Sequence, residues 1–285
     1  MKFLLHLPFS ISILTQSAQG IDDDLMEAFA SLLVLSIPAE YDSVQQKSYV
    51  TYSLSSLSLQ NGNLPTTTLL EARNLVAASG TTGLRTWEAA LHLGNYLCAN
   101  EDLIRGKSIL ELGAGTGYIS ILCSKHLGAG HVLATDGSDD VVSSLSTNFY
   151  LNGLQDSSKI EGKELKWGWA LTAGEHSEWN AGRKIDFVIG ADLTYDISVI
   201  PALVGTFDEL CTLHSEAKVL YAGTVRNPKT FDLFLDACRR SKFVVEDIEF
   251  PMIKAGEQAG PFHSDKVPIQ LCMISRCPKT TVAFT

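Results

Sequence analysis

From residue 106 onward, short apolar runs alternate with amphipathic segments along the chain. Short apolar runs bounded by turn residues are typical of buried strands, and the amphipathic stretches between them are typical of helices. The predicted strands are 108–112, 131–135, 164–167, 185–189, 218–222, 243–248 and 269–275. This alternation is the pattern of repeated βα units, which predicts an α/β fold built on a mostly parallel sheet.

Amphipathic segments between these strands predict helices that end at plausible stop signals. The segment 118–127 ends before Gly128, and 139–151 ends near Gly153. Residues 229–241 predict another helix of the same kind, and 87–97 predict one just ahead of the sheet. A glycine directly after the last periodic residue is a common helix C-terminus, because glycine readily adopts the left-handed conformation needed there.

The first 80 residues do not follow this pattern. We expect them to form an N-terminal extension, partly helical, ahead of a main domain at 81–285. An apolar stretch at 25–35 predicts a helix, and the Ser/Thr/Asn-rich segment 53–68 predicts a long loop. Residues 1–14 have the charged start and apolar stretch of a secretory signal, but polar residues and a proline interrupt the apolar part. We therefore favour a packed N-terminal helix or strand over an export signal.

Composition and charge limit the partners. The 285 residues are 45% hydrophobic and 19% charged, which is enough apolar material for one large core. A net charge of -10 repels a phosphate backbone, so we expect no nucleic-acid partner. The same acidity could steer in a basic protein surface, although solubility is the commoner reason for it. After the N-terminus, no segment approaches the roughly 20 apolar residues that span a bilayer, so we expect no membrane partner.

The cysteine pattern argues against a metal site. None of the six cysteines forms a Cys-x-x-Cys pair, and several lie inside apolar runs, where a thiol acts as a small hydrophobic group. No group of His and Cys residues has zinc-ligand spacing. We expect reduced, structural cysteines and no bound metal.

A glycine-rich turn follows the first predicted strand of the sheet, with the sequence Gly113-Ala-Gly115-Thr-Gly117. Glycine lets the backbone turn sharply and approach a ligand closely. About 20 residues later, Asp136 ends the next strand, where a carboxylate can accept both ribose hydroxyls of an adenosine. A nicotinamide cofactor would need a third small residue at position 118, which is Tyr118. The spacing therefore favours a sulfonium cofactor, S-adenosylmethionine, over a dinucleotide.

A second polar group follows the predicted strand 185–189, where Gly190 leads into Ala191-Asp192-Leu-Thr-Tyr195. Ligands of open α/β folds bind at the carboxyl ends of the strands, so we expect the substrate here. The carboxylate of Asp192 and the phenol of Tyr195 could orient an amine by hydrogen bonds. The alternative is that Asp192 caps a following helix and Tyr195 packs beside it.

Four motifs in this order resemble the seven-β-strand protein-lysine methyltransferases, especially the branch that modifies elongation factor 2. They are Thr82-Gly-Leu-Arg-Thr-Trp87-Glu-Ala-Ala, Leu110-Glu-Leu-Gly-Ala-Gly-Thr-Gly117, Leu165-Lys-Trp167-Gly and Gly190-Ala-Asp192-Leu-Thr-Tyr195. The resemblance covers residues 70–276 and implies a Rossmann-like sheet of seven strands, the last antiparallel, with helices on both faces. It also implies elongation factor 2 as the protein partner and a cytoplasmic location.

The resemblance assigns roles to individual positions. Asp192 and Tyr195 would form the Asp-x-x-Tyr signature at the lysine channel. The residues implied to bind S-adenosylmethionine are Trp87, Gly113, Ala114, Gly115, Asp136, Trp167 and Ala191. Trp169 is close enough in sequence to be an alternative to Trp167, and both tryptophans could instead be core residues.

Several alternatives remain open from the sequence. Amine and amide methyltransferases that act on adenine or glutamine carry Asn-Pro-Pro-Tyr in place of the run that ends at Tyr195, so those substrates are disfavoured. A small-molecule methyltransferase, a different lysine substrate, a nicotinamide oxidoreductase and a non-catalytic binding module are the other candidates. Because a carboxylate stabilises a lysine ammonium, we assign Asp192 to positioning and name no general base.

Overall fold

The computed structural model describes residues 23–33, 46–58, 62–72, 82–169, 171 and 180–276. The chain divides into two compact units, 1–43 and 44–285. The first contains α2 (Asp23–Leu33), which confirms the predicted helix with a shift of its bounds. The element predicted at 1–14, and its alternative as an export signal, lie outside the described residues. In the described part of the chain, no helix is long and apolar enough to cross a membrane.

A seven-stranded sheet forms the centre of the second unit, in the order β5-β4-β3-β6-β7-β9-β8. The strands are β3 (Ser108–Leu112), β4 (His131–Asp136), β5 (Ile160–Glu164), β6 (Phe187–Ala191), β7 (Lys218–Thr224), β8 (Phe243–Ile248) and β9 (Ile269–Arg276). The pairs from β5 through β7 are parallel, whereas β9 is antiparallel to both of its neighbours. The predicted fold class is confirmed, including the antiparallel last strand.

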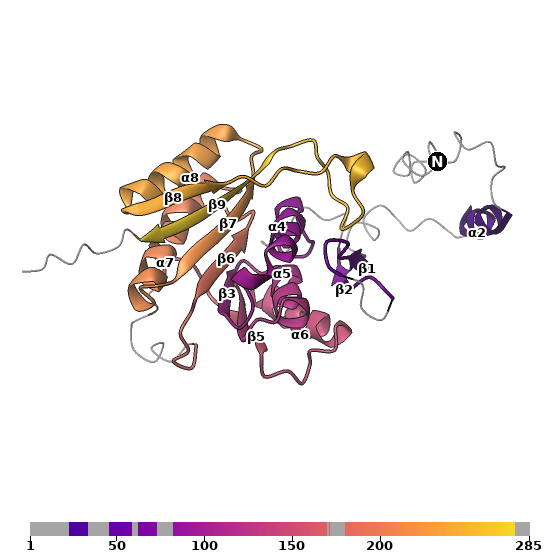
Figure 1. Cartoon of the computed structure of the whole chain (residues 1–285), viewed down its shortest axis with the longest axis horizontal. Helices are drawn as coiled ribbons and strands as arrows, with labels where there is room; N and C mark the ends of the chain where they lie inside the picture. Colours follow the sequence, from indigo (N-terminus) through magenta and orange to yellow (C-terminus); the bar gives the residue numbers. More distant parts are fainter. Residues whose placement is uncertain are drawn as a thin grey trace, which may run out of the picture. The chain divides into compact units, whose positions relative to one another are not determined.

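Helices cover both faces of this sheet. On one face lie α4 (Glu88–Ala99), α5 (Tyr118–Ile121) and α6 (Asp139–Leu151), and on the other lie α7 (Ile200–Leu213) and α8 (Pro228–Arg240) (Figure 1). Neighbouring strand residues point to opposite faces, so Ile109 belongs to the core under α4 to α6 and Leu110 to the core under α7 and α8. A π-helical turn, η3 (Leu122–His126), continues α5 and completes the helix predicted at 118–127.

The strand predicted at 164–167 is wrong, because the edge strand β5 covers Ile160–Glu164 instead. In β5 only Ile160 is buried, and the strand is held by backbone pairing with β4 from Ile160 to Glu164. An edge strand of this kind carries almost no apolar signal. The apolar residues Leu165 and Trp167, which suggested the strand, belong to the loop after it.

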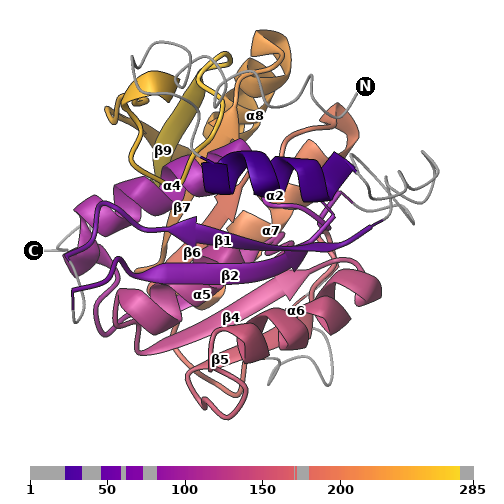
Figure 2. The ribbon, with the colours of Figure 1, turned by 90° about the vertical axis from the view of Figure 1, so that its right-hand side faces the viewer.

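The long loop predicted at 53–68 is wrong at both of its ends, where a hairpin of β1 (Ser48–Ser53) and β2 (Thr66–Glu71) forms. Figure 2 shows this hairpin over the α4 to α6 side of the sheet. Side chains of α6 fix it, since the Asn148 amide oxygen accepts the Leu70 N–H at 2.8 Å and Asn152 accepts the Thr68 N–H at 3.1 Å. Three threonines begin β2, so the sequence looked like a polar loop. The division between an extension and a main domain at residue 80 stays a prediction.

Candidate active site

A cavity of about 660 Å³ opens at the carboxyl ends of β3, β4 and β6. Its volume is typical of small-molecule sites, and its position is where open α/β sheets bind ligands. Every site residue predicted from the sequence lines this cavity: Trp87, Gly113, Ala114, Gly115, Asp136, Trp167, Ala191, Asp192 and Tyr195. The fold thus brings together residues that lie as far apart in the sequence as Trp87 and Tyr195, while their individual roles stay predictions.

The turn after β3 needs its glycines for geometric reasons. Gly113, Gly115 and Gly117 have positive φ angles of +62°, +53° and +81°, which side chains rarely adopt. A Cβ on Gly113 would lie 2.6 Å from Leu193 Cδ2, and one on Gly115 would lie 3.3 Å from the Gly83 carbonyl oxygen. The backbone of the turn therefore lies close to Leu193 and to the segment at Gly83, and a side chain at either glycine would meet them.

Position 118, where a dinucleotide-binding turn has a small residue for close helix packing, is occupied by the large Tyr118. It starts α5 fully buried, and its ring packs against Tyr52 at a centroid distance of 5.4 Å. A Cβ on Gly94 of α4 would lie only 2.7 Å from Tyr118 Cε1. The small residue that allows close packing is thus Gly94 on the neighbouring helix, a relation that the dinucleotide fingerprint does not contain.

Two carboxyl groups border the turn, the buried Glu111 and the half-buried Asp136, and both accept hydrogen bonds from uncharged donors. Asp136 accepts the Gly115 N–H at 3.1 Å and the Ser138 N–H at 3.2 Å. Glu111 accepts the backbone N–H of Ser120 at 2.9 Å as well as its hydroxyl. Burial raises the pKa of Asp136, and burial raises the pKa of Glu111 to about 8. The sequence analysis assigned no role to Glu111, although its position in the strand just before the glycine turn could have suggested one.

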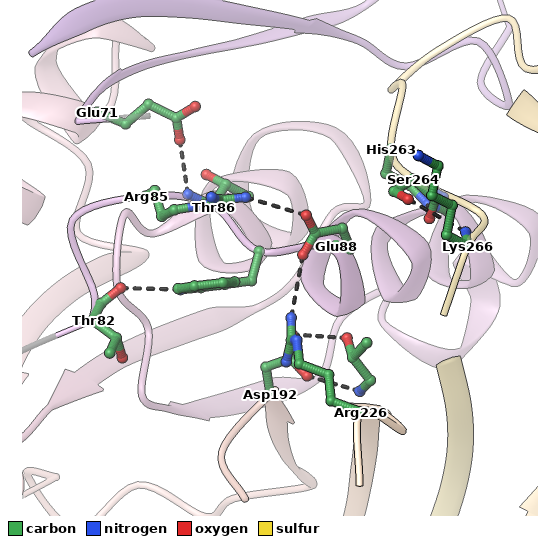
Figure 3. Close-up of polar contacts among 12 residues, drawn as sticks. Glu71, Thr82, Arg85, Thr86, Glu88, Asp192, Arg226, His263, Ser264 and Lys266 are labelled. Atoms are coloured by element: carbon green, nitrogen blue, oxygen red, sulfur yellow. Dashed lines mark hydrogen bonds and ion pairs between the residues drawn. The ribbon is translucent and has the colours of Figure 1, made fainter. Parts of the chain in front are cut away.

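Trp87 is positioned by the segment 82–87 that precedes α4. Its Nε1 donates to the Thr82 carbonyl at 3.0 Å, and the Arg85 guanidinium carbon lies 4.3 Å from the ring centroid (Figure 3). The Thr86 N–H donates to the buried carboxylate of Glu71, at the end of β2, over 2.8 Å. The N-terminal hairpin therefore helps to fix this wall of the cavity.

The two neighbouring tryptophans after β5 occupy different places. Trp167 lines the cavity next to the glycine turn, since a Cβ on Gly113 would lie 3.6 Å from Trp167 Cζ2. Trp169 is 67% exposed and does not line the cavity. Of the two tryptophans, Trp167 is thus the one that lines the cavity, and its role as a cofactor contact stays a prediction.

In the run after β6, packing and hydrogen bonds hold the two middle residues, Leu193 and Thr194, in place. Leu193 is buried between the glycine turn and Gly190, where a Cβ would lie 2.5 Å from its Cδ1. The Thr194 hydroxyl is hydrogen-bonded to the buried Tyr221 hydroxyl at 2.8 Å. Asp192 and Tyr195, which flank these two residues, line the cavity, and Tyr195 is 61% exposed at its rim.

Asp192 is held from β7 and does not cap a helix. Its carboxylate accepts the Thr224 N–H at 2.7 Å and the Thr224 hydroxyl at 2.9 Å, and it pairs with Arg226 at 3.3 Å. The cap of the following 3-10 turn, η5 (Ile197–Val199), is Asp196, which accepts the Ser198 N–H at 2.8 Å. The capping alternative for Asp192 is therefore wrong. Arg226 was not identified from the sequence.

Among the described residues, no group of three or more His, Cys, Asp or Glu side chains is arranged to hold a metal ion. The five cysteines at 98, 123, 211, 238 and 272 are buried free thiols. The expectation that the protein binds no metal stays a prediction.

Comparison with known proteins gives a consistent family. A family model described as lysine methyltransferase matches residues 69–240. The chain is 52% identical over 259 residues to protein-lysine N-methyltransferase EFM3 of Chaetomium thermophilum, covering 90% of this chain and 76% of that protein. It is 31% identical over 224 residues to human protein-lysine N-methyltransferase EEF2KMT, covering 74% of this chain and 62% of that protein.

A solved methyltransferase structure with bound SAH, SMU.776, superposes with a TM-score of 0.51 at 12% identity, over 88% of this chain and 65% of that one. At this identity the likeness supports the fold alone. A nicotinamide oxidoreductase is not compatible with the family match. The chain belongs to the lysine methyltransferase family and is a protein-lysine N-methyltransferase that uses S-adenosylmethionine, as the sequence predicted.

Proposed function

We propose that this enzyme methylates a lysine side chain of translation elongation factor 2. The observation that carries the proposal is that Asp192 and Tyr195 share one cavity with the glycine turn and Asp136. The name of the human relative, EEF2KMT, supports the choice of substrate. A translation factor as substrate implies a cytoplasmic enzyme.

The residues of the inner part of the cavity fit S-adenosylmethionine. The turn at Gly113–Gly115 lines the cavity with backbone, which a ligand could approach closely, and Asp136 offers a carboxylate for the ribose hydroxyls. Trp87 and Trp167 supply aromatic walls, and Ala114 and Ala191 leave space on either side. When bound, the cofactor supplies a methyl group on a positively charged sulfur.

A lysine side chain would enter past Tyr195 at the rim and meet Asp192. The amine would have to be neutral there, with its lone pair free for the methyl group that the bound cofactor would supply. Because the methyl group is already activated, the enzyme's main contribution is to align the amine and exclude water. Asp192 and Tyr195 orient the amine by hydrogen bonds in this scheme.

Labelled S-adenosylmethionine tests the proposal. Calorimetry should show saturable binding of S-adenosylmethionine and S-adenosylhomocysteine but none of NAD. The enzyme should then transfer label to purified elongation factor 2, and changing the substrate's lysines one at a time should remove the label at one position. Label on another protein of a cell extract, with elongation factor 2 unlabelled, would keep the chemistry and reject the substrate.

A further inference from the structure

Arg226, in the loop between β7 and α8, contacts two residues of the cavity wall, Trp87 and Asp192, and the neighbouring Glu88. Its Nη2 lies 3.3 Å from the carboxylate of Asp192 and 3.3 Å from that of Glu88, the first residue of α4 (Figure 3). Its guanidinium carbon lies 5.2 Å from the centre of the Trp87 ring. The side chain is 43% exposed and lines the cavity. One cation thus connects the residues that follow β6 with those that begin α4.

The side chain of Asp192 is held in place beside Arg226. Its side chain is only 8% exposed and is tied to the backbone and hydroxyl of Thr224. Its own backbone has a φ of +54°, an uncommon conformation for a residue with a side chain. The carboxylate of Asp192 is therefore held at the edge of the cavity by the protein itself.

A fixed carboxylate creates a problem for amine methylation. The lysine must react as the neutral amine, although its ordinary pKa is about 10.4. A carboxylate within about 4–6 Å favours the ammonium and so raises that pKa further. Asp192 would place a negative charge beside the amine, and Glu88, which shares Arg226 with Asp192, adds a second one behind it.

The two carboxylates are balanced by two guanidinium groups. Arg85 pairs with Glu88 at 3.2 Å, and Arg226 pairs with both Glu88 and Asp192. The other described titratable groups of the same cavity are Glu111, Tyr118, Asp136, Lys166 and Tyr195, and the buried hydroxyl of Tyr221 on β7 lies near Asp192. Removing Arg226 would leave an uncompensated negative charge where the amine must lose its proton.

We propose that Arg226 is a positioning residue for methyl transfer: it holds Asp192 and cancels its charge, so that Asp192 can orient the lysine amine without keeping it protonated. This inference rests on the proposed function, because it requires a lysine amine beside Asp192. It explains how a carboxylate can belong to a site that needs a neutral nucleophile.

Arg226→Gln tests the charge, Arg226→Lys restores it, and Arg239→Gln is the matched control. Arg239 lies on α8 and pairs with Asp236 at 3.2 Å on an exposed surface. Single-turnover methylation of elongation factor 2 is measured from neutral to alkaline pH, with melting temperatures for each variant. Binding of elongation factor 2 to enzyme loaded with S-adenosylhomocysteine is measured by calorimetry.

The glutamine variant should lose turnover about tenfold at neutral pH and recover at alkaline pH, because the rate profile moves up by about one pH unit. Its affinity for elongation factor 2 should stay equal or become tighter, since the extra negative charge attracts the ammonium. The lysine variant should recover most of the wild-type profile, and the Arg239 control should match wild type.

A loss of turnover by the same factor at every pH, together with weaker binding, would show a purely structural role and overturn the inference. So would wild-type turnover in the folded glutamine variant, or no recovery in the lysine variant. A wild-type enzyme that labels a different protein rejects elongation factor 2 alone, and the same comparison is then made with that protein. A wild-type enzyme that labels no protein overturns the proposed function and the inference together.

Discussion

The two halves of the cavity treat negative charge in opposite ways. At the ends of β3 and β4, Glu111 and Asp136 accept hydrogen bonds from backbone N–H groups and a serine hydroxyl, and burial raises both pKa values. At the ends of β6 and β7, Asp192 pairs with a guanidinium. Burial opposes the charged form of the acids in the first half, whereas a guanidinium balances the charge of the carboxylate in the second. The first half thus disfavours a negative charge, and the second half keeps one and compensates it.

The two halves also meet where Leu193 packs against Gly113, and disturbing this contact should have the largest effect on stability. Gly113→Ala should lower the free energy of unfolding by about 2–4 kcal/mol, because the residue would keep a positive φ and its Cβ would contact Leu193. Leu193 cannot easily move away, since it is also wedged against Gly190. Urea denaturation of the variant measures this loss.

The double variant Gly113→Ala/Leu193→Ala is the control for that contact. Its loss of stability should be smaller than the sum of the two single losses, because removing the leucine side chain relieves the overlap. Fully additive losses would contradict the packing explanation.

In the substrate half, Asp192→Ala and Tyr195→Phe should behave differently from each other. The alanine variant should lose about 1–3 kcal/mol of stability, because the Thr224 N–H loses its acceptor, and should also lose turnover. The phenylalanine variant should keep its melting temperature, because Tyr195 is at the rim, and lose about tenfold in turnover, the rate equivalent of one hydrogen bond. Melting curves and single-turnover rates measure both.

Cofactor affinity should be almost unchanged in Tyr195→Phe. Normal turnover in that variant, once shown to be folded, would remove Tyr195 from the reaction. Weaker cofactor binding with normal turnover at saturation would instead assign Tyr195 to the cofactor half.

In the cofactor half, Asp136→Ala should weaken S-adenosylmethionine binding by about 1–3 kcal/mol, the usual cost of leaving a buried polar partner unmatched. Turnover at saturating cofactor should fall much less. Calorimetry measures the affinity, with Trp169→Ala as the control, because that exposed side chain does not line the cavity. Equal affinity in wild type and the Asp136 variant would mean that another residue holds the ribose.

Counted for each pH unit, the smallest expected effect is a pH dependence of stability that comes from Glu111. Its pKa is raised in the folded protein, from an ordinary 4.5 to about 8, so its contribution to stability is present below pH 4.5 and is lost as the pH rises to about 8. The loss is at most about 1.4 kcal/mol for each pH unit. Glu111→Gln should lack this decline. The melting temperature of the variant minus that of wild type should therefore rise with pH. A constant difference over that window would contradict a protonated Glu111.

The cofactor half could be predicted from the sequence because it is local. One strand, one turn and the end of the next strand contain the glycines and Asp136, and strict periodicity placed β3 and α6 with correct bounds. The edge strand β5 and the hairpin of β1 and β2 were missed, because they are held by backbone pairing and by asparagine side chains from α6. Polar strands without an apolar stripe give no periodic signal.

The substrate half could be predicted only in part. Asp192 and Tyr195 followed a recognisable strand, but Arg226 lies 34 residues after Asp192 and meets Glu88 across 138 residues. A single arginine after a strand has no characteristic spacing, so its pairing appears only when β6, β7 and α4 are brought together. The role of Glu111 was missed for a different reason, since the pKa of a buried acid depends on its surroundings in the folded protein.

Mass spectrometry of elongation factor 2 after incubation with this enzyme and S-adenosylmethionine tests the central claim most directly. We predict added methyl groups on the side-chain nitrogen of one lysine. The modification should be strongly reduced for the folded Tyr195→Phe variant, and more cofactor should not restore it. An unmodified elongation factor 2, beside an enzyme that binds S-adenosylmethionine and is folded, would contradict the proposed substrate. Methyl groups on a different type of side chain would contradict the assignment of Asp192 and Tyr195 to a lysine amine.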